Sequence, residues 1–133
     1  MIKTIIVITL FIFFIFICNL NETKTIENFV NYYISKSNIH GRGVFANKNF
    51  KKDEKINIVF YEVTNKDSKI ADITAFGKMI NHCENNNNTY LKKEGNTFYL
   101  VAKKNINKGD EFKIDYNNTP DYIAKPKKNY KKC

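Results

Sequence analysis

Four short motifs carry the residue types in this chain that could do chemistry. They are Gly41-Arg42-Gly43, Asn81-His82, the turn Ile106–Glu111 with its Gly-Asp-Glu ending, and Ile114-Asp115-Tyr116. Asn81 and His82 end a short apolar run, so an amide and an imidazole lie where a chain tends to be buried and polar groups need hydrogen-bond partners. Each motif alone has an ordinary explanation, because Gly pairs mark turns, Asn caps elements and Tyr116 could pack a core. Their order along the chain is the more specific signal.

In this order the motifs resemble those of the SET-domain protein lysine methyltransferases, most of all the small viral members of that family. The resemblance covers roughly Phe29 to Lys127. It implies a mostly β fold of several small sheets with a pseudoknot-like threaded strand. It also implies a protein-lysine N-methyltransferase that takes its methyl group from S-adenosylmethionine. The methyl acceptor would be a protein lysine side chain, with a histone tail as one candidate.

Cofactor-binding residues follow from this resemblance where the motifs match. The turn at Gly41, Arg42 and Gly43 would bring the backbone close to the amino-acid end of the donor, which a side chain would obstruct. Asn81 would bind the donor's amino group, and the backbone of His82 would contact adenine.

Aromatic residues take the catalytic and channel roles that the resemblance implies. Tyr116 matches the tyrosine whose hydroxyl lies beside the transferring methyl group. Tyr61 and Phe112 are candidates to line a lysine channel, where desolvation would lower the pKa of the substrate ammonium and alignment would favour in-line displacement. Tyr122 lies in a tail similar to the aromatic tail of the small viral members, and it is the candidate to stack on adenine.

Two departures from the family pattern affect these expectations. The sequence after Asn-His reads Cys83-Glu84-Asn85-Asn86-Asn87, so that Asn86 replaces the usual turn proline and Asn87 keeps the last Asn. The segment between Ile56–Val63 and Ala75 is shorter than the family's insert, which puts part of the substrate groove in question. Two alternatives therefore stay open. One is a catalytically weak SET-like binding module, and the other is a membrane-tethered basic protein whose tail, Lys125–Lys132, binds anionic lipid or nucleic acid.

Short strands separated by turns must position these motifs. Runs of β-branched and aromatic residues predict strands at Tyr32–Ser35, Gly43–Ala46, Ile56–Val63, Phe98–Lys103 and Glu111–Tyr116. We expect a polar loop at Asn65–Lys69, a short helix within Ile70–Ile80 and an irregular tail over Asn117–Cys133.

Length and charge indicate one globular domain with a basic surface. The 133 residues suffice for one core, since 43% of them are hydrophobic. The 22 Lys and Arg residues exceed the 13 Asp and Glu residues by 9, which suits nucleic acid or anionic lipid, although solubility of a Lys-rich chain is the simpler explanation. Cys18, Cys83 and Cys133 have no paired spacing, so we expect neither a disulfide framework nor a metal site.

An apolar run at Ile5–Cys18 precedes the predicted domain. It predicts a signal or anchor segment over residues 1–24, ahead of a SET-like domain at residues 29–133. No small-residue cleavage site follows Cys18, which favours an uncleaved membrane anchor over secretion after signal cleavage. Sequons at Asn87 and Asn117 lie inside the motifs, where a glycan would obstruct a ligand. We therefore expect the domain to face the cytosol.

Overall fold

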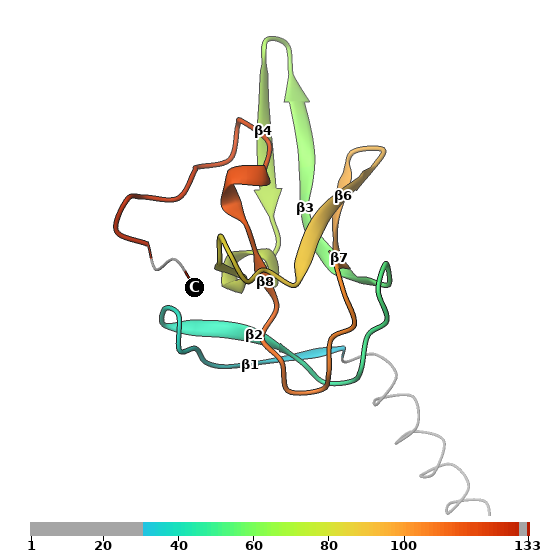
Figure 1. The fold of residues 1–133 in the computed structure, drawn as a ribbon. Helices are drawn as coiled ribbons and strands as arrows, with labels where there is room; N and C mark the ends of the chain where they lie inside the picture. The colour runs from blue at the N-terminus through green and yellow to red at the C-terminus, as the bar shows by residue number, and fades with distance from the viewer. Residues whose placement is uncertain (1–30, 131–132) are drawn as a thin grey trace, which may run out of the picture. The chain divides into compact units, whose positions relative to one another are not determined.

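The computed structural model describes residues 31–130 and residue 133 of the chain. Within these residues the elements are β1 (Tyr32–Lys36), β2 (Arg42–Ala46), β3 (Lys55–Asn65), β4 (Ser68–Ile73), the 3-10 helix η1 (Gly77–Met79), β5 (Asn81–His82), β6 (Thr89–Glu94), β7 (Thr97–Ala102), β8 (Lys113–Ile114) and the 3-10 helix η2 (Tyr116–Asn118). The strands form three small sheets, as Figure 1 shows. The predicted mostly β architecture is confirmed.

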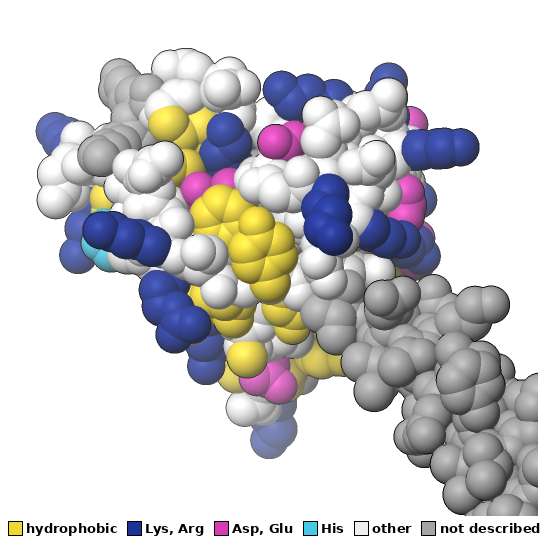
Figure 2. Space-filling view, turned by 90° about the horizontal axis from the view of Figure 1, so that it is seen from below, with side chains coloured by type: hydrophobic (Ala, Val, Ile, Leu, Met, Phe, Trp, Pro, Cys, Tyr) yellow, Lys and Arg dark blue, Asp and Glu magenta, His cyan; other side chains and the backbone are white. Residues whose placement is uncertain are grey.

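The first sheet is the antiparallel hairpin β1–β2 at the bottom of Figure 1. Its turn contains Gly41 at φ +50°, a backbone conformation that favours glycine. Val44 and Ala46 alternate along β2 and are fully buried, so this face of the strand meets the core. On the other face Phe45 stacks on Tyr33 with ring centroids 5.5 Å apart. Figure 2 views the molecule from below, the side of the first sheet, and shows apolar side chains on this surface with Lys and Arg side chains around them.

The second sheet is antiparallel, in the order β4-β3-β7-β6. Strand β3, with 11 residues, pairs with β4 on one side and with β7 on the other. Phe60 of β3 stacks on Phe98 of β7 with ring centroids 4.2 Å apart, the kind of cross-strand aromatic pair that stabilises a sheet. The largest apolar side chains with almost no exposure are Phe50, Phe60, Phe112, Leu100 and Ile106. They form a single core between the first two sheets and the segments that follow β7.

The third sheet is a short parallel pair, β5 with β8, in which Asn81 lies opposite Lys113 and His82 opposite Ile114. Parallel strands need a crossover connection, and here the β6–β7 hairpin lies between them in the chain. The segment that enters β8 also bridges back to the first sheet, since Glu111 pairs with Phe45. The segment from Glu111 to Ile114 therefore connects β5 to the first sheet.

Several element predictions are wrong in detail. Ser68 and Lys69 belong to β4, not to a loop, and the chain reverses within two residues between β3 and β4. The helix expected within Ile70–Ile80 is reduced to the three residues of η1. Strand β6 was not predicted at all. Its outward residues are polar and it pairs only with β7, so tertiary pairing decides its conformation where sequence alternation is weak. The last predicted strand is shorter, because Tyr116 starts η2.

The predicted anchor at Ile5–Cys18 lies outside the described residues. Among the residues that are described, no helix has the length and apolar character needed to cross a membrane. The domain boundaries proposed from the sequence therefore stay predictions.

Cys83 and Cys133 are joined by a disulfide, with their Cα atoms 5.2 Å apart. The expectation that these cysteines are unpaired is therefore wrong. The two residues are 50 positions apart, so no local spacing in the sequence could indicate the pair. Because Cys83 directly follows β5, the disulfide connects the end of the tail to the strand that carries Asn81 and His82.

Candidate functional site

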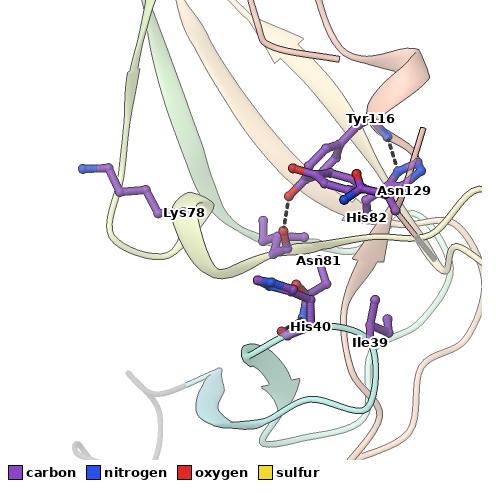
Figure 3. Close-up of a pocket in the computed structure, with 9 residues that line it drawn as sticks. Ile39, His40, Lys78, Asn81, His82, Tyr116 and Asn129 are labelled. Carbon is purple, nitrogen blue, oxygen red and sulfur yellow. Dashed lines mark hydrogen bonds between the residues drawn. The ribbon is translucent and has the colours of Figure 1, made fainter. Parts of the chain in front are cut away.

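A cavity of about 380 Å³ lies beside β5, and Figure 3 shows how its side chains converge from distant segments. Its lining consists of Ile39, His40, Lys78, Ile80, Asn81, His82, Tyr116, Asn129 and Tyr130. The turn before β2, the segment η1–β5, the start of η2 and the tail each contribute. Three of the residues that the sequence predicts for the site, Asn81, His82 and Tyr116, come together here.

The side-chain amide of Asn81 is held at its nitrogen end. Nδ2 donates to Glu111 Oε1 at 2.7 Å, and it lies 3.2 Å from the carbonyl oxygen of His40 and 3.3 Å from that of Arg42. All three partners are acceptors, so this end of the amide must be the nitrogen. The amide oxygen, at the opposite end, is the group left to meet a ligand in the cavity.

Glu111 lies beneath this arrangement and is itself fixed. Its second carboxylate oxygen accepts from Ser37 Oγ at 2.9 Å. A Cβ atom added at Gly43 would lie 2.0 Å from Glu111 Oε1, so the carboxylate occupies the space that a side chain there would need. The position of the Glu111 carboxylate therefore requires a glycine at residue 43, whether or not a ligand also comes close to this turn.

His82 is oriented by the backbone of Tyr116. The Tyr116 N–H donates to His82 Nδ1 at 3.0 Å, which makes Nδ1 an acceptor and leaves the ring proton on Nε2. The ring is thus neutral in this arrangement, and its 3.8 Å approach to Asp115 Oδ1 is not an ion pair. This hydrogen bond lies directly after the β5–β8 pairing, so the parallel register sets the position of Tyr116 relative to His82.

The hydroxyl of Tyr116 points into the same region and donates to the carbonyl oxygen of Ile80 (Figure 3). Burial raises the pKa of Tyr116, and the neighbouring Tyr130 raises it further. The phenol therefore stays protonated at neutral pH. Two oxygens, the Tyr116 hydroxyl and the Ile80 carbonyl, lie side by side at this end of the cavity.

The tail contributes Tyr130 to the site. Its ring lies 6.0 Å from His82 and 6.5 Å from Tyr116, centroid to centroid. Tyr122, the residue predicted to stack on adenine, does not line this cavity. It packs against Phe60 and donates to Glu62 Oε2 at 2.6 Å, on the β3 side of the molecule.

The two residues predicted for a substrate channel do not meet. Phe112 is fully buried and packs edge-on against Phe50 with centroids 5.5 Å apart, so as a core residue it contradicts the prediction. Phe112 directly follows Glu111, and its apolar ring points into the core and packs there. Tyr61 is 42% exposed on β3 and does not line the cavity.

The Gly-x-Gly turn contributes through its backbone. Arg42 has an exposed side chain, and its carbonyl oxygen is one of the acceptors for Asn81. Gly41 and Gly43 do not line the cavity either, whereas His40, directly before them, does.

Sequence reasoning missed two residues that organise the site. Glu111 was seen only as part of a turn motif. Asn88 is buried, and its side chain donates to the Glu111 carbonyl and accepts from the Lys113 N–H, both at 2.8 Å. It thereby holds the entry to β8. A run of four identical residues gave no signal of which Asn would be buried.

Comparisons with known proteins concern the fold of this chain. The model of the SET domain matches residues 60–117 of the chain. Solved structures that match include a Plasmodium falciparum protein described as a candidate histone methyltransferase, with 27% identity and a TM-score of 0.53, covering 67% of this chain and 95% of that one. No curated protein sequence matches.

Two further structures show the same fold at lower identity. CpSET8 from Cryptosporidium has 22% identity and a TM-score of 0.51, over 67% of this chain and 59% of that one. A humanized mutant of the Chaetomium thermophilum Polycomb Repressive Complex 2, bound to the inhibitor GSK126, has 17% identity and a TM-score of 0.53, over 68% of this chain and 15% of that one. The chain thus spans less than two thirds of each of these two relatives.

The described residues have the fold of a SET domain, and the SET-domain model matches within them. Proteins with this domain are generally protein lysine methyltransferases that use S-adenosylmethionine. Within the described residues, no group of three His, Cys, Asp or Glu side chains could hold a metal ion.

Proposed function

We propose that this protein is a protein-lysine N-methyltransferase that binds S-adenosylmethionine in the cavity beside β5. The observation that carries the proposal is the convergence of Asn81, His82 and Tyr116 on one cavity from segments 34 residues apart. A partly buried amide, a buried imidazole and a protonated phenol around one cavity form a polar cluster that packing of the core does not require. A histone tail is the proposed class of substrate, because a similar structure is described as a candidate histone methyltransferase.

The lining of the cavity fits the proposed cofactor. Its amide oxygen at Asn81 suits an ammonium group, and the ring of Tyr130 offers a face for a flat base. Lys78 also lines the cavity and supplies a cation for a carboxylate. A volume of about 380 Å³ lies within the range of small-molecule sites, roughly 300–1,000 Å³. When bound, S-adenosylmethionine supplies an activated sulfonium methyl group.

The residues of this chain would then have to bind the donor, orient the substrate amine and exclude water. An incoming amine would find two acceptors, the Tyr116 hydroxyl oxygen and the Ile80 carbonyl oxygen, which fix its direction. The raised pKa of Tyr116 keeps the phenol neutral, so that Tyr116 orients the amine and does not remove its proton. Alignment of this kind accounts for a large part of the barrier reduction in displacement reactions.

A catalytically weak SET-like binding module is the second candidate function. The position of Phe112 in the core favours it, because one of the two predicted channel residues is unable to contact a substrate lysine. The two candidates share donor binding and differ in turnover.

The test is donor binding followed by transfer. Calorimetry on the full-length protein should detect S-adenosylmethionine and its demethylated product, S-adenosylhomocysteine. Transfer of radiolabelled methyl groups to a histone mixture should then be measured, with Glu94→Gln, an exposed change at the β6–β7 turn, as the matched control. A folded protein that binds neither ligand would contradict both candidates. Binding without transfer to any protein would select the binding module.

A further inference from the structure

We propose that Glu111 is the positioning residue of this site: its carboxylate fixes the direction of the Asn81 amide, so that the amide oxygen receives the amino group of the methyl donor. The inference rests on the proposed function and deepens it. Glu111 touches neither the reacting atoms nor the cavity, and it acts through Asn81.

The argument begins with the two ends of an amide. An Asn side chain carries a donor at one end and an acceptor at the other, and a rotation of its terminal bond exchanges them. An amino group in its ammonium form only donates hydrogen bonds. It therefore binds Asn81 in one of the two orientations and is repelled by the other.

Glu111 selects the productive orientation. An ionised carboxylate only accepts, and its oxygen lies 2.7 Å from Asn81 Nδ2, the shortest of the three contacts at that nitrogen. The reversed amide would place its oxygen against this carboxylate and against the carbonyl oxygens of His40 and Arg42. Three acceptors facing a fourth acceptor exclude that orientation.

The carboxylate is itself built into the fold. Ser37 Oγ holds its second oxygen, and the absence of a side chain at Gly43 gives it room. The Asn88 amide donates to the Glu111 carbonyl oxygen, and the next residue, Phe112, donates its N–H to the Val44 carbonyl oxygen at 2.8 Å. Both the side chain and the backbone of Glu111 are thus fixed from different segments, as a positioning group must be.

Glu111→Gln is the informative variant. Glutamine has nearly the same shape, but it offers either an oxygen or an NH₂ group to Asn81, so only the weaker contacts to the His40 and Arg42 carbonyl oxygens still favour one direction of the Asn81 amide. We expect affinity for S-adenosylhomocysteine to fall at least about tenfold, because a hydrogen bond to a charged group is lost in part of the population. Affinity for a deaminated analogue that lacks the amino group should stay within about twofold of wild type, since that ligand makes no use of the Asn81 oxygen.

Calorimetry with both ligands measures this selectivity on the full-length protein, and melting temperature reports the fold. The side-chain amide signals of Asn81 in a ¹⁵N-edited NMR spectrum give a readout without ligand, and Glu111→Gln should shift them. Glu94→Gln, on an exposed carboxylate of β6 in a different sheet from Asn81, is the matched control and should change neither affinity nor these signals.

The outcomes separate the two proposals. A wild-type protein that does not bind S-adenosylhomocysteine overturns the proposed function and this inference with it. Wild-type binding with no loss in Glu111→Gln, or with equal loss for both ligands, overturns the role of Glu111 alone. Should Glu111→Gln fail to fold, Ser37→Ala, which frees one carboxylate oxygen, must show a smaller loss of affinity confined to the ligand with the amino group; otherwise the inference is wrong.

Discussion

At the scale of single residues, Glu62 is a buried charge with three partners. Its carboxylate accepts from Lys93 Nζ at 2.8 Å and from the Tyr122 hydroxyl at 2.6 Å, and Lys69 Nζ lies 3.4 Å away. Hydrogen bonds from Lys93 and then Tyr122 lower the pKa of Glu62 to about 2. Burial and the bond to Glu62 raise the pKa of Tyr122 to about 12. This cluster ties the tail to β3 and β6.

Glu62 gives the domain a pH-dependent stability. Because its pKa is lower in the folded chain than the ordinary value of 4.5, its contribution is complete above about pH 4.5 and is lost as pH falls towards 2. Glu62→Gln should lower the melting temperature at pH 7 and flatten its decline between pH 4.5 and 2. Melting curves across this range test the expectation. Glu84→Gln, at an exposed position, is the control. If the melting temperature of Glu62→Gln declines as steeply with falling pH as that of wild type, the prediction is wrong.

Tyr116→Phe should reduce methyl transfer about 100-fold while changing donor affinity little. The hydroxyl is expected to act once the amine is aligned, whereas the ring keeps its contact with His82, centroids 5.1 Å apart. Loss of the hydrogen bond to Ile80 should cost about 1 kcal/mol of stability. Turnover, donor affinity and melting temperature on one preparation separate these effects. Unchanged turnover in an active enzyme would restrict Tyr116 to a structural role.

Gly43→Ala should destabilise the domain by about 1–3 kcal/mol, the usual range for overpacking. The new Cβ would lie 2.0 Å from Glu111 Oε1 and displace the carboxylate. Gly95→Ala is the comparison, because a Cβ atom at Gly95 would meet no other atom within 4 Å, so that only the backbone conformation at φ +58° opposes the change. Denaturant unfolding measures both. Adding Glu111→Ala to Gly43→Ala should recover part of the loss, and strict additivity of the two changes would refute a steric origin.

The sequence predicts the residues with a distinctive chemical type better than the residues that hold them. Asn81, His82 and Tyr116 were identified from motifs, and the structure brings them to one cavity. Glu111 was missed because its importance depends on what lies 30 and 74 residues away, at Asn81 and Ser37. An aromatic residue of the tail was expected in the site, and Tyr130 lines the cavity whereas Tyr122 does not. In an irregular tail, the positions of aromatic residues in the sequence do not determine which ring packs against the cavity.

At the scale of elements, the strands with strong β-branched and aromatic patterns were predicted, and β4 and β6 were not. Strand β4 has only partly buried or exposed residues, and β6 exposes Lys92, Lys93 and Glu94 at its end. Both are edge strands of the four-stranded sheet, and their conformation depends on pairing. The pattern of residues adjacent in the sequence says little about pairing with a distant strand.

The tail is the element whose attachment can be changed most simply. The disulfide between Cys83 and Cys133 closes a loop of about 50 residues, which in the chain-entropy model contributes about 4 kcal/mol of stability. Cys133→Ser should lower stability by up to that amount and weaken donor binding several-fold, because Asn129 and Tyr130 lose the nearby anchor. Unfolding and calorimetry measure the two effects.

Reductant gives the matched control for this variant. It should reproduce both effects in wild type and change nothing in Cys133→Ser. If Cys133→Ser binds the donor as wild type does, the tail is held by its other contacts. Mass spectrometry after thiol alkylation would show the state of the pair in cells, where a cytosolic domain is expected to keep its thiols reduced.

At the scale of the whole molecule, the full-length chain is expected in the membrane fraction after carbonate washing, because of the apolar segment Ile5–Cys18. We also expect no endoglycosidase-sensitive mass. Asn87 Nδ2 donates to the Cys83 and Glu84 carbonyl oxygens, bonds that a glycan on that nitrogen would disturb. A chain deleted for residues 1–24 is the control and should be soluble. Soluble full-length protein, or a mass change on deglycosylation, would contradict this prediction.

The parallel pairing of β5 with β8 has a consequence for how the protein is made. Synthesis delivers Asn81 and His82 well before Lys113 and Ile114, so strand β5 leaves the ribosome without its neighbour. Once β7 has been made as well, the apolar faces of β2, β3 and β7 are all present, but Glu111 and Phe112, which join the sheets, are still missing. A nascent chain therefore lacks the complete site proposed for the donor, and we expect no stabilisation by that ligand at this stage. Until the last strand arrives, those apolar faces stay exposed, which is a condition that favours aggregation.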